Sequence, residues 1–321
     1  MIYLEYCITA FFVVFLSIKA SRYIDLLDKN TSLSGAFLGG IVLSAVTSLP
    51  ELFTSISATA LLDRQGLCLG NILGSDLFNL AALSLVVLLF FKGFNKGKVS
   101  KSYRHVAVFV LLIYLLLSLN FIEVLHFRVL HLSITSILIA LIYVCGAKYL
   151  AVAEDVQTDE DALGYHASTS TSLALNQIAF RFFMAAVGII VFSVMVTYFA
   201  SQISSRLNLV QGFAGAVFLG IATSLPEVTS TVTLFKMKNY NIAVGNIIGS
   251  NLFNFIILVA ADFLSLRSGV YDAMDHQIIA LMIFGAIATV LFWIMLKLKK
   301  RSVCAVCALG TMACYIAALL V

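Results

Sequence analysis

Charged residues and prolines are scarce in this sequence. Only 11% of the 321 residues are Asp, Glu, Lys or Arg, and 61% are hydrophobic, whereas an average soluble domain has about 25% charged residues. Apolar runs near or above the roughly 18–20 residues that cross a bilayer recur along the whole length. The composition excludes a water-soluble domain of ordinary size and predicts one all-α integral membrane domain.

Several features of secreted, metal-binding or catalytic proteins are also missing. No basic residue precedes the first apolar run, at about 4–18, so we expect a retained helix instead of a cleaved signal. The six cysteines are scattered, and the CxxC spacing of Cys304 and Cys307 lacks a second ligand pair, which indicates packing. The five histidines form no cluster, and no nucleophile with a base indicates an enzyme. The net charge of +4 forms no patch typical of nucleic-acid binding.

Polar breaks divide the chain into ten apolar segments. They predict transmembrane helices at about 3–19, 34–62, 68–91, 105–122, 129–153, 177–200, 210–235, 241–266, 274–297 and 303–321. The longest break, 154–176, contains an acidic cluster followed by the run STSTS. We interpret it as a solvated cytoplasmic linker between two five-helix units, 1–153 and 177–321.

The basic residues predict the orientation of the chain. If alternate loops face the same side, one side holds all of the 20 Lys and Arg residues except Arg64, Arg128, Arg206 and Arg267. Cytoplasmic loops carry the excess of Lys and Arg in membrane proteins. Both termini are therefore predicted to lie outside the cytoplasm, with the protein in the cell membrane.

The only two prolines of the chain lie in a repeated motif. Residues 47–79 read TSLPELFTSISATALLDRQGLCLGNILGSDLFN, and residues 223–254 read TSLPEVTSTVTLFKMKNYNIAVGNIIGSNLFN. Because each unit has an odd number of helices, the second unit must enter the membrane from the opposite face. This pattern is typical of inverted-repeat secondary transporters, whose ions or substrates bind near the middle of the membrane where the repeats meet.

A proline and a glutamate are adjacent in each copy, as Pro50 with Glu51 and Pro226 with Glu227. Proline has no N–H, so the carbonyl four residues earlier loses its helical partner and the preceding turn should open. A carboxylate at the centre of a bilayer costs at least about 2.5–3.5 kcal/mol on insertion scales. The two glutamates therefore need a partner such as a cation or a proton.

Other oxygen-bearing side chains recur at four-residue spacing in the same motifs. Thr47 and Thr223 each stand four residues before a glutamate, on one helical stripe. The second helix of each motif carries Asn71, Ser75 and Asn79, or Asn246, Ser250 and Asn254. This oxygen set suits Ca²⁺ or Na⁺ better than softer metals. Glycine pairs at 70/74 and 245/249 predict close backbone approach.

The two blocks TSLPE and GNILGSDLFN, repeated as TSLPE and GNIIGSNLFN, resemble the alpha-1 and alpha-2 repeats of the cation/calcium exchanger superfamily, in particular its prokaryotic sodium/calcium exchangers. The resemblance implies exchange of Na⁺ for Ca²⁺ by alternating access, without a cofactor and with a monomer sufficient for transport. It also implies that Glu51 and Glu227 are the central ligands. The remaining implied ligands are Thr47, Thr223, Ser75, Ser250, Asn79 and Asn254, with Ser48 and Ser224 supporting the opened turns.

The chain departs from the family pattern at two places. Some relatives carry Asp at one of the positions of Asn79 and Asn254, and its absence here counts against K⁺ co-transport. Asp76 stands where the other repeat has Asn251, and two interpretations stay open: a role beside the ion ligands or in proton linkage, or a packing residue with local hydrogen bonds. Since membrane carboxylates also carry protons, a Ca²⁺/H⁺ antiporter is the alternative function. A channel is disfavoured because nothing resembles a selectivity filter.

Overall fold

The computed structural model describes residues 2–61, 63–125, 127–129, 132–152, 173–206, 219–265, 269–273 and 275–321. Eight helices in these ranges are long and apolar enough to cross a membrane. They are α1 (Ile2–Asn30), α5 (Gln65–Leu89), α7 (Ser102–Phe121), α8 (Ile134–Ala151), α10 (Leu175–Arg206), α14 (Tyr240–Leu264), α15 (His276–Leu298) and α16 (Arg301–Leu320). A bent pair, Gly35–Thr47 with Leu49–Ala60, meets the same criterion as one further span. The prediction of an all-α membrane protein is confirmed at this level.

Both motif segments are divided into short helices. The first consists of α2 (Gly35–Phe37), a π-helical turn η1 (Leu38–Leu43), α3 (Ser44–Thr47), α4 (Leu49–Ile56) and a π-helical turn η2 (Ser57–Leu61). The second consists of α12 (Gly220–Thr223) and α13 (Leu225–Lys236). The expected start of this second segment, at 210, lies outside the described residues. Single π-helical turns are frequent at functional sites.

Three helix boundaries differ from those expected by five residues or more, and one of them is the end of α10, which continues to Arg206 instead of ending near residue 200. The first helix continues to Asn30 instead of ending near residue 19, because the buried Asp25 accepts a hydrogen bond from Asn239 and pairs with Lys29 at 3.0 Å. The start of the helix expected at 129–153 instead contains β2 (Leu132–Ser133), which pairs antiparallel with β1 (Arg128–Val129), and α8 starts at Ile134. Residues 154–172, which make up most of the expected linker 154–176, lie outside the described residues.

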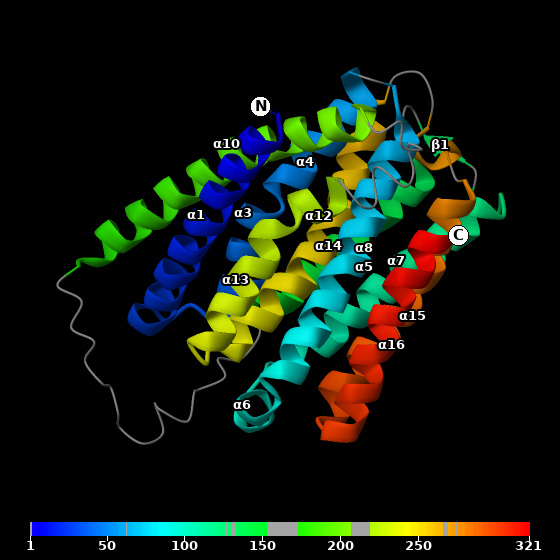
Figure 1. The fold of residues 1–321 in the computed structure, drawn as a ribbon. Coiled ribbons are helices and arrows are strands. Elements are labelled where there is room, and N and C mark those ends of the chain that lie inside the picture. Colours follow the sequence, from blue (N-terminus) through cyan, green and yellow to red (C-terminus); the bar gives the residue numbers. More distant parts are fainter. Residues whose placement is uncertain are drawn as a thin grey trace.

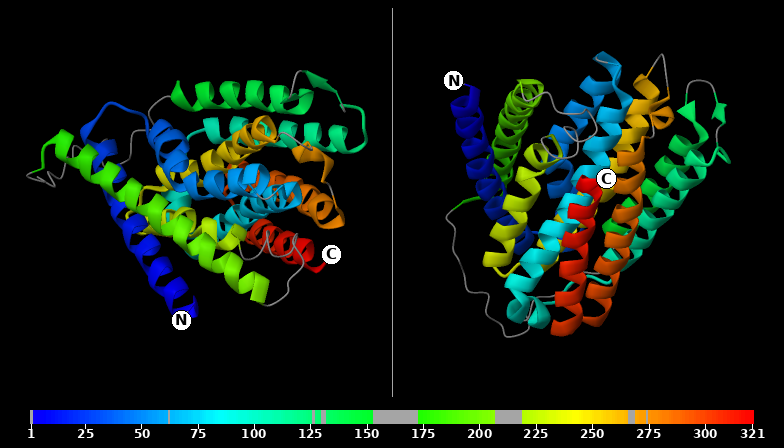
Figure 2. Two further views of the ribbon diagram at one scale, coloured as in Figure 1. Left: turned by 90° about the horizontal axis from the view of Figure 1, so that it is seen from above. Right: turned by 45° about the vertical axis from the view of Figure 1, so that its right-hand side comes forward.

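Helices α1 and α10 lie against each other along one side of the bundle (Figures 1 and 2). The rings of Phe12 and Phe192 stack between them, with centroids 4.7 Å apart. Large apolar side chains point outward from both helices, including Phe11, Phe15, Phe180 and Phe183. Such an apolar exterior is what a bilayer favours on a lipid-facing surface.

Helices α5 and α14 are the most buried of the long helices. Their surroundings include the broken segments, because α14 packs on η1 and α3 whereas α5 packs on α12. At the α14–η1 contact, a Cβ added at Gly249 would lie 2.6 Å from the carbonyl carbon of Gly40. The close backbone approach predicted from the 245/249 glycine pair is therefore confirmed. It brings the motif of one half against the motif of the other.

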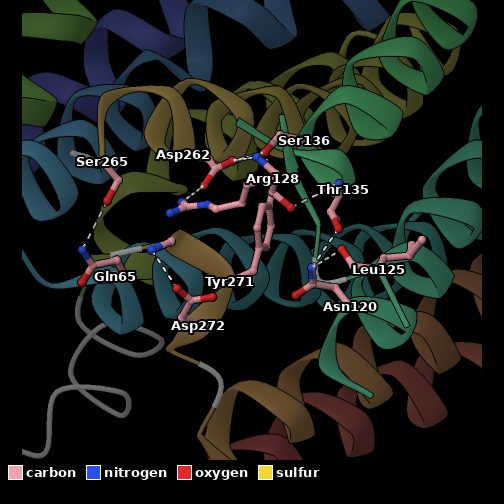
Figure 3. A network of polar contacts seen from close by, with 12 residues as sticks. Gln65, Asn120, Leu125, Arg128, Thr135, Ser136, Asp262, Ser265, Tyr271 and Asp272 are labelled. Carbon is pink, nitrogen blue, oxygen red and sulfur yellow. Dashed lines mark hydrogen bonds and ion pairs between the residues drawn. The ribbon is translucent and has the colours of Figure 1, made fainter. Parts of the chain in front are cut away.

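A polar network fixes the connection between α7 and α8 to the carboxyl end of α14 (Figure 3). The fully buried Asp262 accepts hydrogen bonds from the Ser136 hydroxyl at 2.7 Å and the Ser133 amide at 2.9 Å, and lies 3.4 Å from Arg128. Tyr271, in the short helix η4 (Val270–Asp272), contacts the Ser136 hydroxyl at 2.9 Å. Burial raises the pKa of Tyr271 well above its usual value. Its hydroxyl therefore stays protonated and available to this network.

Candidate cation-binding site

The two broken segments interrupt their helices at the same motif position. α3 ends at Thr47 and α4 begins at Leu49, with Ser48 between them at φ −91° and ψ 6°. Ser224 separates α12 from α13 with nearly the same angles, φ −84° and ψ 3°. The opened turn predicted before each proline is confirmed. Pro50 and Pro226 stand in the first turn of the following helix, where a missing N–H costs little.

Each glutamate is held by the serine at the break of the opposite half. Glu51 and Glu227 have no solvent exposure. The Ser48 hydroxyl donates to Oε1 of Glu227 at 3.0 Å, and the Ser224 hydroxyl donates to Oε1 of Glu51 at 3.3 Å. These reciprocal bonds bring both carboxyl groups to one region between the halves. Ser48 and Ser224 therefore contact the implied central ligands directly, and not only their own turns.

The threonine hydroxyls also make their contacts across the halves. Thr47 Oγ1 lies 3.4 Å from the Ser250 hydroxyl on α14, and Thr223 Oγ1 lies 3.4 Å from the Ser75 hydroxyl on α5. We expected threonine and glutamate to stack along one continuous stripe. The break at the intervening serine interrupts that stripe, because the proline prevents a regular helix there. The partners of each threonine hydroxyl instead include a serine of the other half.

Asn79 and Asn254 face the partner central helix. The Asn254 amide donates to Asp76 Oδ1 at 2.7 Å, and the Asn79 amide donates to Asn251 Oδ1 at 3.2 Å. The Asn251 amide in turn donates to the backbone oxygen of Asp76 at 2.9 Å. All four side chains are buried. Asn79 and Asn254 thus lie at the contact between α5 and α14.

Five buried oxygens of these residues have no hydrogen-bond donor among the described residues. They are Oε2 of Glu51, Oε2 of Glu227, Oδ2 of Asp76, Oδ1 of Asn79 and Oδ1 of Asn254. Leaving a buried polar atom unpaired costs about 1–3 kcal/mol, and more for a charged group. Within the same ranges, no group of three His, Cys, Asp or Glu side chains is placed to hold a metal ion. A cation here would depend on amide and hydroxyl oxygens as well as carboxylates.

Asn246 and Asn71 were seen in the four-residue pattern but not assigned to the site. Asn246 Nδ2 donates to the backbone oxygen of Glu227 at 3.2 Å, while its Oδ1 accepts from the Thr47 hydroxyl at 3.2 Å. Asn71 Nδ2 donates to the Ser55 hydroxyl at 3.2 Å, and its Oδ1 lies 3.5 Å from the Thr223 hydroxyl. These amides fix the threonines on both sides. The sequence indicates this role only through the repetition of Asn71 and Asn246 at the same position of the two motifs.

One family model matches most of the chain. The sodium/calcium exchanger protein family matches residues 4–150 and 178–321. Among solved structures, the sodium-calcium exchanger NCX_Mj soaked with 10 mM Na⁺ and zero Ca²⁺ is similar, with 18% identity, 98% of each chain covered and a TM-score of 0.72. The same exchanger soaked with 100 mM Na⁺ and 10 mM Sr²⁺ has 17% identity, the same coverage and a TM-score of 0.71. At this identity the likeness shows a shared fold. No curated protein sequence matches the chain.

Proposed function

Because the chain belongs to the sodium/calcium exchanger family, we propose that it exchanges Na⁺ for Ca²⁺ across the cell membrane by alternating access, with Glu51 and Glu227 as the central cation ligands. Cation exchange follows from the family. We propose in addition that the two ions are Na⁺ and Ca²⁺ and that the residues named here are their ligands. Thr47, Thr223, Ser75, Ser250, Asn79 and Asn254 complete the ligand set.

The observation that carries this proposal is the set of buried oxygens without donors. Two glutamates each use one carboxylate oxygen to accept a serine hydroxyl of the opposite half, and each leaves the other oxygen unpaired. The central asparagines leave their amide oxygens unpaired as well. Hard oxygen donors of this kind are typical ligands of Ca²⁺ and other hard cations. A bound cation would satisfy several of these oxygens together.

The proposed architecture consists of ten transmembrane helices in two inverted five-helix repeats, 1–153 and 177–321, joined by a cytoplasmic linker at 154–176. The reciprocal serine–glutamate bonds support it, because they relate the two motifs as matched halves. The bias of Lys and Arg toward alternate loops supports an orientation with both termini outside the cytoplasm. In this arrangement the site is exposed to each side in turn.

The proposal is tested with purified protein in liposomes. Ca²⁺ uptake should be fast when the vesicles are loaded with Na⁺, and slow when only a pH gradient is imposed. Uptake that follows the pH gradient and ignores Na⁺ would establish the alternative, a Ca²⁺/H⁺ antiporter. Absence of uptake under both gradients would contradict exchange of either kind.

Two substitutions test the ligand assignment. Glu51→Gln and Glu227→Gln should each abolish exchange, because an amide keeps the shape of the side chain but removes a negative charge from the site. Lys96→Glu is the matched control, since it changes the charge of an exposed residue in the connection between α5 and α7. It should keep the Na⁺ and Ca²⁺ dependence of the unmodified protein. Transport that persists in both glutamine variants would remove the assignment.

A further inference from the structure

Asn71 and Asn246 stand at the same position of the two central helices, four residues before Ser75 and Ser250. Neither asparagine belongs to the proposed ligand set. Both side chains have no solvent exposure, although an asparagine amide carries two N–H donors and an acceptor oxygen. A buried amide is costly unless its polar atoms are hydrogen-bonded. The partners of these two amides therefore indicate what they do.

The orientation of the Asn246 amide is fixed by a backbone carbonyl. Nδ2 donates to the backbone oxygen of Glu227 at 3.2 Å and to the Thr231 hydroxyl at 3.4 Å. A carbonyl oxygen can only accept a hydrogen bond, so the amide nitrogen must face Glu227. Oδ1 consequently faces Thr47 of the opposite half, whose hydroxyl donates to it at 3.2 Å.

Asn71 makes a looser version of the same bridge. Its Nδ2 donates to the Ser55 hydroxyl at 3.2 Å, and its Oδ1 accepts from the Thr223 hydroxyl of the opposite half at 3.5 Å. Ser55 stands four residues after Glu51, as Thr231 stands four residues after the other glutamate. Because a hydroxyl can donate or accept, Ser55 constrains its amide less than a carbonyl does. The two bridges match in their partners but differ in how firmly the amide is fixed.

Each threonine hydroxyl has one proton and a choice of acceptors. Thr47 Oγ1 lies 3.1 Å from the Leu43 carbonyl oxygen and 3.2 Å from Asn246 Oδ1. Thr223 Oγ1 likewise lies 3.0 Å from the Leu219 carbonyl oxygen. The carbonyl belongs to the threonine's own segment, whereas the asparagine belongs to the opposite half. A hydroxyl that binds a cation must direct its lone pairs at the cation and its proton to another acceptor.

Resting on the proposed function, we propose that Asn71 and Asn246 are positioning residues for ion binding. Each accepts the hydroxyl proton of the threonine on the opposite half, so that the threonine oxygen keeps its lone pairs for a cation. When the halves separate, the proton turns to the carbonyl of the threonine's own segment, and no buried donor is left unpaired. Thr47 and Thr223 are thus ordered for binding only while the halves are together.

The test is Asn246→Ala, measured by calorimetric titration of the purified protein with Ca²⁺ and with Na⁺, and by Ca²⁺ uptake into Na⁺-loaded liposomes. Both half-saturation concentrations should rise about fivefold, the effect of losing one neutral hydrogen bond. Maximal uptake should fall by less than about twofold, because the threonine proton still has its own carbonyl during movement. Asn71→Ala should raise the same concentrations by only about twofold, since its bridge is looser.

Asn120→Ala is the matched control. Asn120 is a buried asparagine outside both motifs, and it donates to the Thr135 hydroxyl at 2.9 Å between α7 and α8 (Figure 3). The control should lower the melting temperature about as much as Asn246→Ala does, because each variant removes a buried amide and its hydrogen bonds. It should leave the half-saturation concentrations of Ca²⁺ and Na⁺ unchanged.

The crosswise pairing provides an independent measurement. Thr47→Val removes the hydroxyl that Asn246 accepts, so the variant with both Asn246→Ala and Thr47→Val should match Thr47→Val alone in half-saturation to within about twofold. Asn246 and Thr223 share no hydrogen-bond partner among the described residues, so their increases should multiply. If Asn246→Ala does not fold, judged by size-exclusion chromatography, Asn71→Ala combined with Thr223→Val or with Thr47→Val carries the same test.

The outcomes separate this inference from the proposed function. If the unmodified protein exchanges Na⁺ for Ca²⁺ but Asn246→Ala keeps both half-saturation concentrations, Asn246 does not position the site. A lower melting temperature with unchanged half-saturation, as expected for Asn120→Ala, would identify a packing residue and overturn the inference. Increases that multiply for Asn246 with Thr47 would do the same. Failure to exchange while Ca²⁺ still binds contradicts the proposed function alone, and the Ca²⁺ titrations of the variants then decide on Asn246. Absence of Ca²⁺ and Na⁺ binding overturns both.

Discussion

Gly249→Ala should disrupt the contact that joins the two halves at the site. A Cβ at Gly249 would lie 2.6 Å from the carbonyl carbon and 2.7 Å from the Cα of Gly40, and closer still to the carbonyl oxygen. Non-bonded carbon atoms are relaxed at about 3.5–4.0 Å, so α14 and η1 must separate by about 1 Å. The colliding atoms are backbone, and no side chain can rotate away to make room.

The expected loss follows from these distances. Overpacking of a core costs about 1–3 kcal/mol, and the gain from replacing a helical glycine by alanine offsets up to about 1 kcal/mol of it. We expect a net destabilisation of about 2 kcal/mol, which corresponds to a melting temperature lower by about 4–8 °C at 2–4 °C per kcal/mol. The Thr47 hydroxyl lies 3.4 Å from the Ser250 hydroxyl, which in turn lies 3.5 Å from the Ser44 carbonyl oxygen. Moving α14 away from the first broken segment by about 1 Å would therefore also break these contacts.

Thermal unfolding in detergent and Na⁺-driven Ca²⁺ uptake together measure this effect. Uptake by Gly249→Ala should fall at least about tenfold, since the site loses contacts from both halves. Gly66→Ala is the matched control: its Cβ would meet no atom closer than 3.8 Å, and it should be neutral or slightly stabilising. If Gly249→Ala and Gly66→Ala have the same melting temperature and the same rate of Ca²⁺ uptake, the contact of Gly249 with Gly40 does not set the geometry of the site.

Three further predictions concern the site, the network around Asp262 and the orientation of the chain. Ser224→Ala removes the hydroxyl that lies 3.3 Å from Oε1 of Glu51. Because hydrogen bonds to charged groups contribute about 1.5–3 kcal/mol, the Ca²⁺ concentration for half-maximal uptake should rise about tenfold or more. An unchanged concentration would show that this bond is not used during binding. Arg128→Gln removes the half-exposed guanidinium from the network in Figure 3. It should lower the free energy of unfolding by about 1 kcal/mol after solvent screening and leave ion selectivity unchanged. A change in ion selectivity would count against a purely structural network. In a cysteine-free background, Lys96→Cys should react with an impermeant maleimide only from the cytoplasmic side. Glu123→Cys should react only from the opposite side. Labelling from the reverse sides would contradict the proposed orientation.

The helix breaks could be predicted from a single sequence because their causes are local. A proline lacks its N–H wherever it stands, and the glutamate beside it belongs to the same five-residue motif. The chain has only two prolines, so the repetition of Pro50 and Pro226 in one five-residue motif is conspicuous. The oxygen-rich positions on α5 and α14 were predictable for the same reason, because their spacing is a property of one helix.

The pairings between elements were not predictable from this sequence alone. Nothing local indicates that Ser48 bonds to Glu227 and not to Glu51, since the answer depends on how the two halves cross. The length of α1 was underestimated for a similar reason: Asp25 looks like the polar end of a helix until Asn239, more than 200 residues later, is seen to pair with it. The pairing of β2 with β1 likewise depends on Asp262, which accepts a hydrogen bond from the Ser133 amide.

The crosswise arrangement has a consequence for how binding and movement are linked. Because Ser48 holds Glu227 and Ser224 holds Glu51, neither half contains a glutamate together with its serine donor. Displacement of one broken segment relative to the other changes both bonds at the same time, because each bond joins the two halves. Cations bound to both carboxylates would therefore resist sliding of the halves, and ion release would remove that resistance. A site divided in this way couples ion occupancy to the relative position of the repeats, which a site built from one half could not do.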